Sequence, residues 1–368
     1  MYNILFISSE FPPGPGGIGE HAYNITNELR KQNINVDIIT RSRFQFPHQH
    51  YDKTIPMTIL RYSSLTQLFN CYYNFFNQQI KRQKRYDWVF VSGLNHVIAI
   101  GILQYFVKIK SLTILHGHEP LMVKNIKKLI LFYALKKMDI IVAVSNFSKK
   151  SVQKLINDKN IIVINNGLDP YRIDKYCNIN KKKNPIQYDG LIRLITVGRL
   201  CKRKGQHNII NALGNLEKYY PEIEYHMVGL PQDITRLKKL ALDKNVQNKV
   251  IFHGFLDDKK MFNLLQDCDI FLLLSENQDD GDVEGFGIVI LEANYLGLPC
   301  IGSIGCGIED AIDDNINGIL INPLKKIELI EALDKIIKSY NYYSYNARLF
   351  SRNKTWKNVA KSYLNLLK

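Results

Sequence analysis

Short apolar runs typical of buried strands alternate with longer stretches of helical periodicity along the whole chain. In the first half, the predicted strands are apolar and short, and they cover residues 4–8, 36–40, 88–92, 112–116, 140–145 and 161–164. The predicted helices between and after them cover 18–32, 68–84, 95–108, 122–137 and 146–157. Apolar strands joined through helices indicate an α/β fold with a parallel sheet that helices cover on both faces.

A polar stretch interrupts this alternation, and we interpret residues 171–190 as an exposed linker. The alternation then restarts, with predicted strands at 191–197, 225–228, 250–253, 270–274 and 300–302. Predicted helices cover 205–218, 233–244, 258–266, 287–296 and 324–338. We therefore expect two Rossmann-like lobes, residues 1–170 and 191–344, with a ligand-binding interdomain cleft at the carboxyl ends of their strands. A tail, 345–368, has apolar residues at helical spacing and should pack on one of the lobes.

Length and composition agree with a cytoplasmic protein of two domains. A chain of 368 residues exceeds the usual size of a single core. Its longest apolar runs are shorter than the roughly 18 to 20 residues that span a bilayer, and its first residues lack the basic segment of a signal peptide. The six cysteines form no CxxC pair, so we expect reduced thiols.

Positive charge is concentrated in the first half of the chain. Residues 1–180 hold 23 Lys and Arg against 11 Asp and Glu, whereas residues 181–368 hold 26 against 23. The predicted helix 122–137 combines lysines with an apolar stripe, a pattern found in helices that lie on anionic membranes and also in ordinary surface helices. An anionic membrane surface, a phosphate-bearing lipid or nucleic acid is a candidate partner, and a merely solvated basic surface is the alternative.

Two acidic residues bracket an otherwise apolar and glycine-rich segment, Glu284-Gly-Phe-Gly-Ile-Val-Ile-Leu-Glu292. The glycines predict a turn, after which a buried helix begins near Ile288. A carboxylate at position 292 of such a helix needs a specific hydrogen-bonding partner. Glu284 precedes the helix, beside backbone amides able to face an anion. The pair predicts a site for a polyhydroxylated ligand that carries phosphate.

A basic loop follows the first predicted strand of the second lobe, in Gly198-Arg199-Leu-Cys-Lys-Arg-Lys204-Gly205. The planar guanidinium of Arg199 and the mobile ammonium of Lys204 suit a diphosphate. We interpret the intervening Lys202 and Arg203 as solvated.

Glycines and a histidine mark the ends of two strands in the first lobe. Gly14 to Gly19 follow the first strand and open a helix, although no Gly-Lys-Ser/Thr completes a Walker A loop. His116 ends the strand 112–116, where its ring could hydrogen-bond a sugar hydroxyl. A metal site of His116, His118 and Glu119 is the less favoured alternative, because these residues lack a convincing further ligand.

These motifs together resemble the retaining glycosyltransferases of family 4, which have the two-lobed GT-B fold. The resemblance spans nearly the whole chain. Besides the segments above, it rests on residues 144–149, Asn166-Gly-Leu-Asp169, Gly305 to Gly307 and Asn317-Gly318. The Glu-x7-Glu element with Gly-Phe-Gly inside it is its most specific part.

The resemblance implies a role for each matching residue. Arg199 and Lys204 would neutralise the diphosphate of a nucleotide-sugar, so that neither a metal nor another cofactor is required. Glu292 would accept hydrogen bonds from the ribose, and Glu284 would contact the donor sugar. The backbone amides of Phe286, Gly287 and Ile288 would face sugar and phosphate. In the first lobe, His116 would lie near the reacting sugar, and Gly16 and Gly17 would make room for the diphosphate. The tail 345–368 would form a closing helix that crosses back to the first lobe.

The expected reaction is transfer of the sugar to a hydroxyl of a glycan or lipid-linked acceptor, in the synthesis of a cell-surface polysaccharide or glycolipid. A nucleotide-sugar epimerase of the same fold is the alternative enzyme. A basic nucleic-acid-binding protein is a remote one, since no nucleic-acid motif is present. The sequence leaves the donor base, the sugar and the acceptor open.

Overall fold

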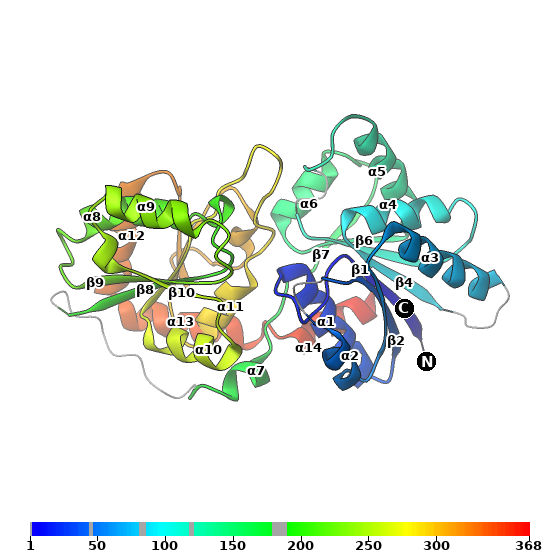
Figure 1. Ribbon diagram of the computed structural model, residues 1–368, viewed down its shortest axis with the longest axis horizontal. Coiled ribbons are helices and arrows are strands. Elements are labelled where there is room, and N and C mark those ends of the chain that lie inside the picture. Colours follow the sequence, from blue (N-terminus) through cyan, green and yellow to red (C-terminus); the bar gives the residue numbers. More distant parts are fainter. Residues whose placement is uncertain (1, 44–46, 81–85, 118–120, 179–189) are drawn as a thin grey trace. The chain divides into compact units, whose positions relative to one another are not determined.

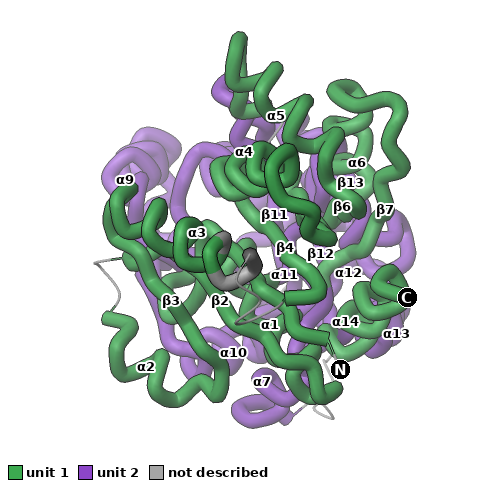
Figure 2. Tube along the Cα trace, turned by 90° about the vertical axis from the view of Figure 1, so that its right-hand side faces the viewer, with its two compact units in different colours: residues 1–166, 356–368 green, residues 167–355 purple. Residues whose placement is uncertain are grey.

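The computed structural model describes residues 2–43, 47–80, 86–117, 121–178 and 190–368 (Figure 1). The chain divides into two compact units (Figure 2). Unit 1 comprises residues 1–166 together with 356–368, and unit 2 comprises residues 167–355. Each unit has its own parallel sheet, so each is described by itself.

Unit 1 is built on a seven-stranded sheet of order β3-β2-β1-β4-β5-β6-β7. Its strands are β1 (Asn3–Ser8), β2 (Asn35–Arg41), β3 (Thr58–Tyr62), β4 (Trp88–Ser92), β5 (Ser111–Leu115), β6 (Ile140–Ala143) and β7 (Ile161–Val163). Its helices are α1 (Gly17–Lys31), α2 (Gln49–Thr54), α3 (Leu65–Ile80), α4 (Leu94–Leu103), α5 (Asn125–Lys137), α6 (Asn146–Gln153) and α14 (Trp356–Asn365). Every strand pairing is parallel, in agreement with the apolar strands of the sequence.

Unit 2 repeats the plan with a six-stranded parallel sheet of order β10-β9-β8-β11-β12-β13. Its strands are β8 (Ile192–Val197), β9 (Ile223–Val228), β10 (Val250–Gly254), β11 (Ile270–Leu273), β12 (Cys300–Ser303) and β13 (Gly318–Ile321). Its helices are α7 (Pro170–Asp174), α8 (Gln206–Leu216), α9 (Ile234–Asp243), α10 (Asp258–Asp267), α11 (Ile288–Tyr295), α12 (Lys326–Lys338) and α13 (Tyr340–Arg352), with 3-10 turns η1 (Lys202–Lys204), η2 (Gln247–Lys249) and η3 (Gly307–Asp310).

The strand orders create one switch point in each sheet. In unit 1 the chain proceeds from β1 outward through β2 and β3, then returns to add β4 on the other side of β1. In unit 2 it does the same at β8 and β11. Ligands of open parallel sheets bind beyond the carboxyl ends of the strands at such points. The loops after β1, β4, β8 and β11 are therefore the places to look for a site.

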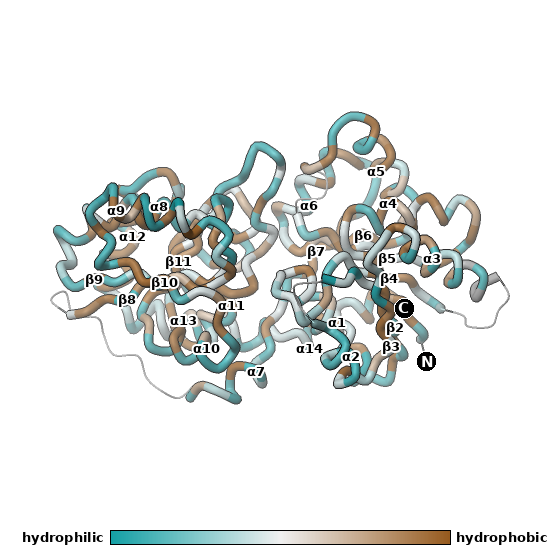
Figure 3. The backbone as a smooth tube through the Cα atoms, in the orientation of Figure 1, coloured by the Kyte–Doolittle hydropathy of each residue, from teal (hydrophilic) through white to brown (hydrophobic). Residues whose placement is uncertain are grey.

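Buried apolar side chains form a core on each sheet, and Figure 3 shows hydrophobic residues gathered on the strands of both. The predicted two-lobed α/β fold is confirmed. The structure adds two strands that the sequence analysis did not predict, β3 and β13, which both lie at a sheet edge. Most of the predicted linker 171–190 lies outside the described residues, and its first part contains α7.

The tail 345–368 contains the end of one helix and the whole of another. Its first residues belong to α13, which packs in unit 2, whereas α14 belongs to unit 1. Between the two helices, Asn353 to Thr355 break the helical course. All six cysteines are free thiols. Among the described residues, no helix combines the length and the hydropathy needed to cross a membrane.

Candidate functional site

The loop after β8 turns two basic side chains inward and leaves two outside. Lys202 and Arg199 are exposed, whereas the side chains of Arg203 and Lys204 are only 13% and 12% exposed. The turn η1 then ends at Gly205, with φ of 70°. A Cβ atom at Gly205 would lie 1.6 Å from the carbonyl oxygen of Leu274, so the loop after β8 fits against the end of β11 only with glycine there.

Glu284 receives the two inward-facing cations. Lys204 Nζ lies 2.6 Å from Glu284 Oε2, and Arg203 Nη1 donates to the same oxygen. The guanidinium also donates from Nε to Asp282 Oδ2, at 3.0 Å. The interpretation of Arg203 as a solvated residue is therefore wrong. It is a largely enclosed partner of Glu284, while the predicted residue Lys204 shares that carboxylate.

The two cations determine the charge state of Glu284. Burial by itself would raise the pKa of this carboxyl group, but the charges of Lys204 and Arg203 outweigh burial and lower the pKa to about 2. Burial disfavours the charged guanidinium of Arg203, yet Glu284 and Asp282 raise its pKa. Glu284 and Arg203 are thus ionised at neutral pH, and Lys204 is positioned beside Glu284 at the switch point of the sheet.

Glycines shape the turn between Glu284 and α11. Gly287 has φ of 88° and precedes the first residue of the helix, Ile288. The backbone nitrogen of Gly307 donates to the carbonyl of Glu284 at 2.8 Å. A Cβ atom at Gly307 would lie 1.9 Å from the carbonyl oxygen of Gly285, so the loop after β12 packs closely against this turn and needs glycine at position 307. Residues 286–288, whose amides were predicted to face sugar and phosphate, therefore lie at the amino end of α11, beside the first backbone amides of the helix.

Glu292 lies one turn further along α11, buried as the sequence predicts, with an exposed fraction of 6%. The partner that such a carboxylate requires is Arg172 of α7, whose Nη1 lies 3.2 Å from Glu292 Oε1. Arg172 also binds Asp258 through Nε and Nη2, at 2.7 and 2.6 Å, and its guanidinium lies 5.3 Å from the centre of the Phe262 ring. Arg172 lies in the predicted linker 171–190, where no site residue was expected.

A second cluster of polar side chains lies at the end of β11, next to the cluster around Glu284. Glu276 Oε1 is 2.9 Å from His207 Nε2 and also accepts from Asn208. Nearby, Ser275 Oγ and Gln206 Oε1 are buried without a hydrogen-bonding partner among the described residues. A hollow of about 180 Å³ lies here, lined by residues that follow β11, β12 and β13. Polar atoms available at the rim of a hollow are typical of a ligand site.

In unit 1, the predicted glycine loop lies between β1 and α1. A Cβ atom at Gly16 would lie 2.2 Å from Glu10 Oε2, whereas one at Gly17 would meet open space. Glu10 pairs with Arg43, whose Nη1 donates to the carbonyl of Pro15 at 2.9 Å. Gly17 opens α1, so the loop brings the amino end of a helix to the switch point of this sheet.

His116 follows β5 and is buried, with Nε2 located 2.8 Å from Ser92 Oγ. Its ring packs edge-on against His21 of α1, at 5.2 Å between centroids. His21 in turn contacts Trp356 and Tyr363 of α14. Burial lowers the pKa of His21 to about 3, so this second imidazole is neutral. The alternative metal ligands His118 and Glu119 lie outside the described residues, and the described ranges hold no group of three His, Cys, Asp or Glu able to bind a metal.

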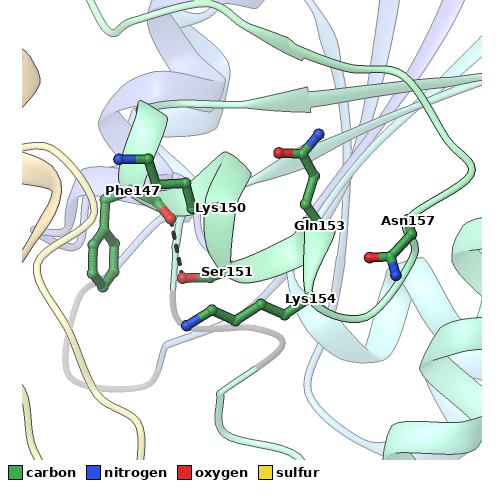
Figure 4. Close-up of a pocket in the computed structure, with 6 residues that line it drawn as sticks. All are labelled: Phe147, Lys150, Ser151, Gln153, Lys154 and Asn157. Atoms are coloured by element: carbon green, nitrogen blue, oxygen red, sulfur yellow. Dashed lines mark hydrogen bonds between the residues drawn. The ribbon is translucent and has the colours of Figure 1, made fainter.

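The predicted residues thus fall into two groups, one in each unit. Lys204, Glu284, residues 286–288 and Glu292 gather around the amino end of α11, with Arg199 on the same loop as Lys204. Gly16, Gly17 and His116 lie in unit 1. A further hollow on α6, lined by Phe147, Lys150, Ser151, Gln153, Lys154 and Asn157, contains none of them (Figure 4).

Two sequence-family models match the chain, one in each half. The model described as Glycosyltransferase Family 4 matches residues 15–172, and the model described as Glycosyl transferases group 1 matches residues 178–351. The second match includes every predicted site residue from Arg199 to Glu292.

Curated relatives share the sequence over different lengths. An uncharacterized glycosyltransferase of Methanocaldococcus jannaschii is 32% identical over 246 residues, which cover 65% of this chain and 60% of the relative. A GDP-mannose-dependent monoacylated alpha-(1-6)-phosphatidylinositol monomannoside mannosyltransferase of Corynebacterium glutamicum is 24% identical over 350 residues, or 91% of this chain and 89% of the relative.

Among solved structures, Alr3699/HepE of Anabaena, crystallised with UDP and glucose, matches with a TM-score of 0.78 at 19% identity. The match covers 100% of this chain and 99% of that one. At this identity the match establishes the fold alone, the GT-B fold with its two α/β lobes.

Proposed function

The chain belongs to glycosyltransferase family 4, and we propose that it moves a sugar from a nucleotide-diphosphate sugar to a hydroxyl of a glycan or lipid-linked acceptor. The proposed reaction retains the anomeric configuration, needs no metal, and serves the synthesis of a cell-surface polysaccharide or glycolipid. We place the enzyme in the cytoplasm, at the inner face of the membrane. The mannosyltransferase of C. glutamicum, named for a GDP-mannose donor and a phosphatidylinositol mannoside, supports this class of donor and acceptor. The UDP and glucose bound to HepE support it too.

One observation carries the proposal: Lys204 and Glu284 pair at the amino end of α11, at the switch point of the unit 2 sheet. An ammonium group and the amides of a helix amino end both favour a diphosphate. A carboxylate beside them suits the hydroxyl groups of a sugar, because it only accepts hydrogen bonds. Glu292 presents a second carboxylate one helical turn away, where it would accept from the ribose.

In the proposed mechanism, Lys204 and the exposed Arg199 neutralise charge as the bond between the anomeric carbon and the diphosphate breaks. No nucleophilic side chain is assigned. The acceptor hydroxyl attacks the anomeric carbon from the same face that the leaving group leaves from. Its proton passes to the departing phosphate oxygen. Glu284 holds the sugar, and the backbone amides of residues 286–288 face the phosphate. Gly16 and Gly17 admit the diphosphate, and His116 hydrogen-bonds the reacting sugar.

Thermal unfolding in the presence of a panel of nucleotide-sugars tests donor binding. A ligand of the native state raises the melting temperature, and we expect one donor to do so well above the others. The shift should disappear in Glu292→Ala and persist in Glu331→Ala, a substitution at an exposed glutamate of α12. Absence of a shift with every nucleotide-sugar, or its survival in Glu292→Ala, contradicts the donor assignment.

Product analysis separates transfer from epimerisation. With the stabilising donor, we expect release of the nucleoside diphosphate that depends on an added acceptor and continues in the presence of EDTA. NMR of the product should show the anomeric configuration of the donor. Sugar isomerisation without acceptor would identify an epimerase instead, and loss of activity in EDTA would contradict metal independence.

A further inference from the structure

Three helices of unit 1 carry solvent-exposed apolar side chains on one side of the sheet. Figures 1 and 2 show α4 between α3 and α5 in unit 1. Helix α4 contacts each of the other two: Tyr72 of α3 hydrogen-bonds His96 of α4 at 2.6 Å. On α4, a Cβ atom at Gly101 would lie 2.5 Å from the Cα of Ala134 of α5. Helix α4 therefore lies against both α3 and α5, and the three helices are neighbours in unit 1.

The outer side of α5 is apolar where a surface helix is usually polar. Leu131, Ala134 and Leu135 pack inward. Ile126, Leu129 and Tyr133, spaced at three and seven residues, share the opposite side of the helix and are exposed. This is a second apolar stripe on one helix, and it faces solvent.

The neighbouring helices extend the stripe. On α3, Leu65, Phe69 and Tyr73 follow each other at four-residue spacing and are exposed. After α4, Tyr105 and Phe106 are exposed as well, and Lys137 of α5 lies 4.2 Å from the centre of the Tyr105 ring. We call these eight side chains, Leu65, Phe69, Tyr73, Tyr105, Phe106, Ile126, Leu129 and Tyr133, the outer apolar face.

Positive charge accompanies this face. The described residues between 65 and 138 contain seven lysines and one acidic residue, so they contribute +6 of net charge. Lys127, Lys128, Lys136 and Lys137 of α5 are all exposed beside the apolar stripe. Exposed aromatic and aliphatic groups ringed by lysines complement a surface with acyl chains beneath anionic headgroups.

We infer that the outer apolar face is a docking surface for an anionic lipid bilayer. Its apolar side chains enter the boundary between headgroups and acyl chains, and the lysines pair with lipid phosphates. The inference gives a location to the membrane association in the proposed function, but it rests on unit 1 alone and not on the donor residues of unit 2. It assigns unit 1 the task of bringing the enzyme to a lipid-linked acceptor.

Flotation of the full chain with vesicles tests the inference. We expect binding to phosphatidylcholine vesicles that contain phosphatidylglycerol, weakening as salt rises, and far weaker binding to phosphatidylcholine alone. Phe106→Ser/Ile126→Ser should reduce the affinity by about tenfold or more, because each side chain is a large part of the inserted area. Lys127→Glu/Lys128→Glu should reduce it by about tenfold as well and weaken its dependence on salt.

Matched controls come from unit 2. Leu324 is 70% exposed, close to the 71% of Ile126 and the 77% of Phe106, and Ile327 is exposed too. Leu324→Ser/Ile327→Ser should leave vesicle binding unchanged, as should Lys259→Glu/Lys260→Glu on α10. Absence of wild-type binding to anionic vesicles overturns the inference. An equal loss of vesicle binding in the variants of the outer apolar face and in the control variants overturns it too. Dissociation of an oligomer by Phe106→Ser/Ile126→Ser would also overturn it, because the face would then join copies of the chain.

Donor binding is measured on the same variants without vesicles. The nucleotide-sugar should stabilise the variants of the outer apolar face as it stabilises the wild type, since their substituted side chains are exposed and lie in unit 1, whereas the donor residues lie in unit 2. If donors stabilise the protein while vesicles do not bind, the docking surface is wrong and the proposed transferase stands. Vesicle binding without any donor effect supports the docking surface and contradicts the proposed function.

Discussion

Arg203 and Lys202 are neighbours in the sequence, yet only Lys202 is exposed to solvent. The turn η1 sends successive side chains in different directions, and Arg203 reaches Asp282 and Glu284. A loop has no period from which an inward residue can be recognised. The partners of Arg203 also lie about 80 residues away, so nothing near it in the sequence marks it.

Arg203→Ala should lower the free energy of unfolding by about 3 kcal/mol, because it leaves Asp282 and part of the charge of Glu284 without their cation. The exposed Lys202→Ala serves as the control and should have little effect on stability. Urea unfolding of both variants gives the comparison. Equal stabilities would mean that Arg203 does not hold the cluster together.

The lowered pKa of Glu284 predicts a particular dependence of stability on pH. Its folded-state value of about 2 lies below the ordinary value of 4.5. As pH falls below about 4.5 the unfolded chain binds a proton first, so the stabilisation by this carboxylate is complete above that pH and is lost on the way to pH 2. Glu284→Gln should therefore be less stable at neutral pH and show a shallower decline between pH 4.5 and 2. Urea unfolding at a series of pH values measures both slopes, and identical slopes would contradict the lowered pKa.

At the scale of elements, the alternation of apolar runs and helical periods was sufficient to predict the fold and the start of α11 next to Gly287. The two missed strands have a physical reason. In β3, exposed and half-buried residues alternate because the strand lies at the edge of its sheet. β13 lies at the edge of its sheet too, and β12 is the strand that pairs with it. Such strands are stabilised by a neighbouring strand more than by their own pattern.

The glycine that connects β8 to α8 gives a prediction at this scale. Gly205→Ala combines a left-handed φ of 70° with a Cβ atom 1.6 Å from the carbonyl oxygen of Leu274. Gly254→Ala has a similar φ of 68°, but its Cβ atom would meet open space. We expect a loss of about 1 kcal/mol at position 254 and at least about 3 kcal/mol at position 205, where the loop must also move. Thermal unfolding of the two variants tests the difference, and similar losses would show that the loop contact is loose.

At the scale of the whole molecule, the end of the chain completes the unit in which the chain begins. Trp356, Val359, Ala360 and Tyr363 of α14 are buried, and Tyr363 hydrogen-bonds His21 of α1 at 3.2 Å. Their helical spacing predicted that the tail packs. Spacing alone does not indicate which unit covers it, since that depends on a surface formed by residues more than 300 positions earlier.

Trp356→Ala should remove about 3–5 kcal/mol of stability from unit 1, as expected for a large aromatic side chain deleted from a core. Asn365→Ala, at an exposed position of the same helix, is the control. Calorimetry should show that one unfolding transition moves to lower temperature in Trp356→Ala. If that variant unfolds like the wild type, α14 contributes little to unit 1.

The sequence alone indicated part of the candidate site. Charges and glycines next to strand ends indicated Lys204 and Glu284, because strand ends of a parallel sheet converge, and an acidic residue within an apolar helix indicated Glu292. Arg172 was not predictable, because it reaches Glu292 across 120 positions from a segment that has the composition of a linker. Local pattern shows which residues are unusual, and only the folded chain shows what they bind.

The central claim is that Lys204, with Glu284 and Glu292, holds the diphosphate sugar at the amino end of α11. Its most direct test is the dissociation constant of the stabilising nucleotide-sugar, measured by calorimetric titration of the wild type, Lys204→Ala and Lys202→Ala. We predict binding weaker by about tenfold or more in Lys204→Ala, from the loss of a charge-assisted contact, and unchanged binding in Lys202→Ala. Equal affinity of Lys204→Ala and the wild type would contradict the claim.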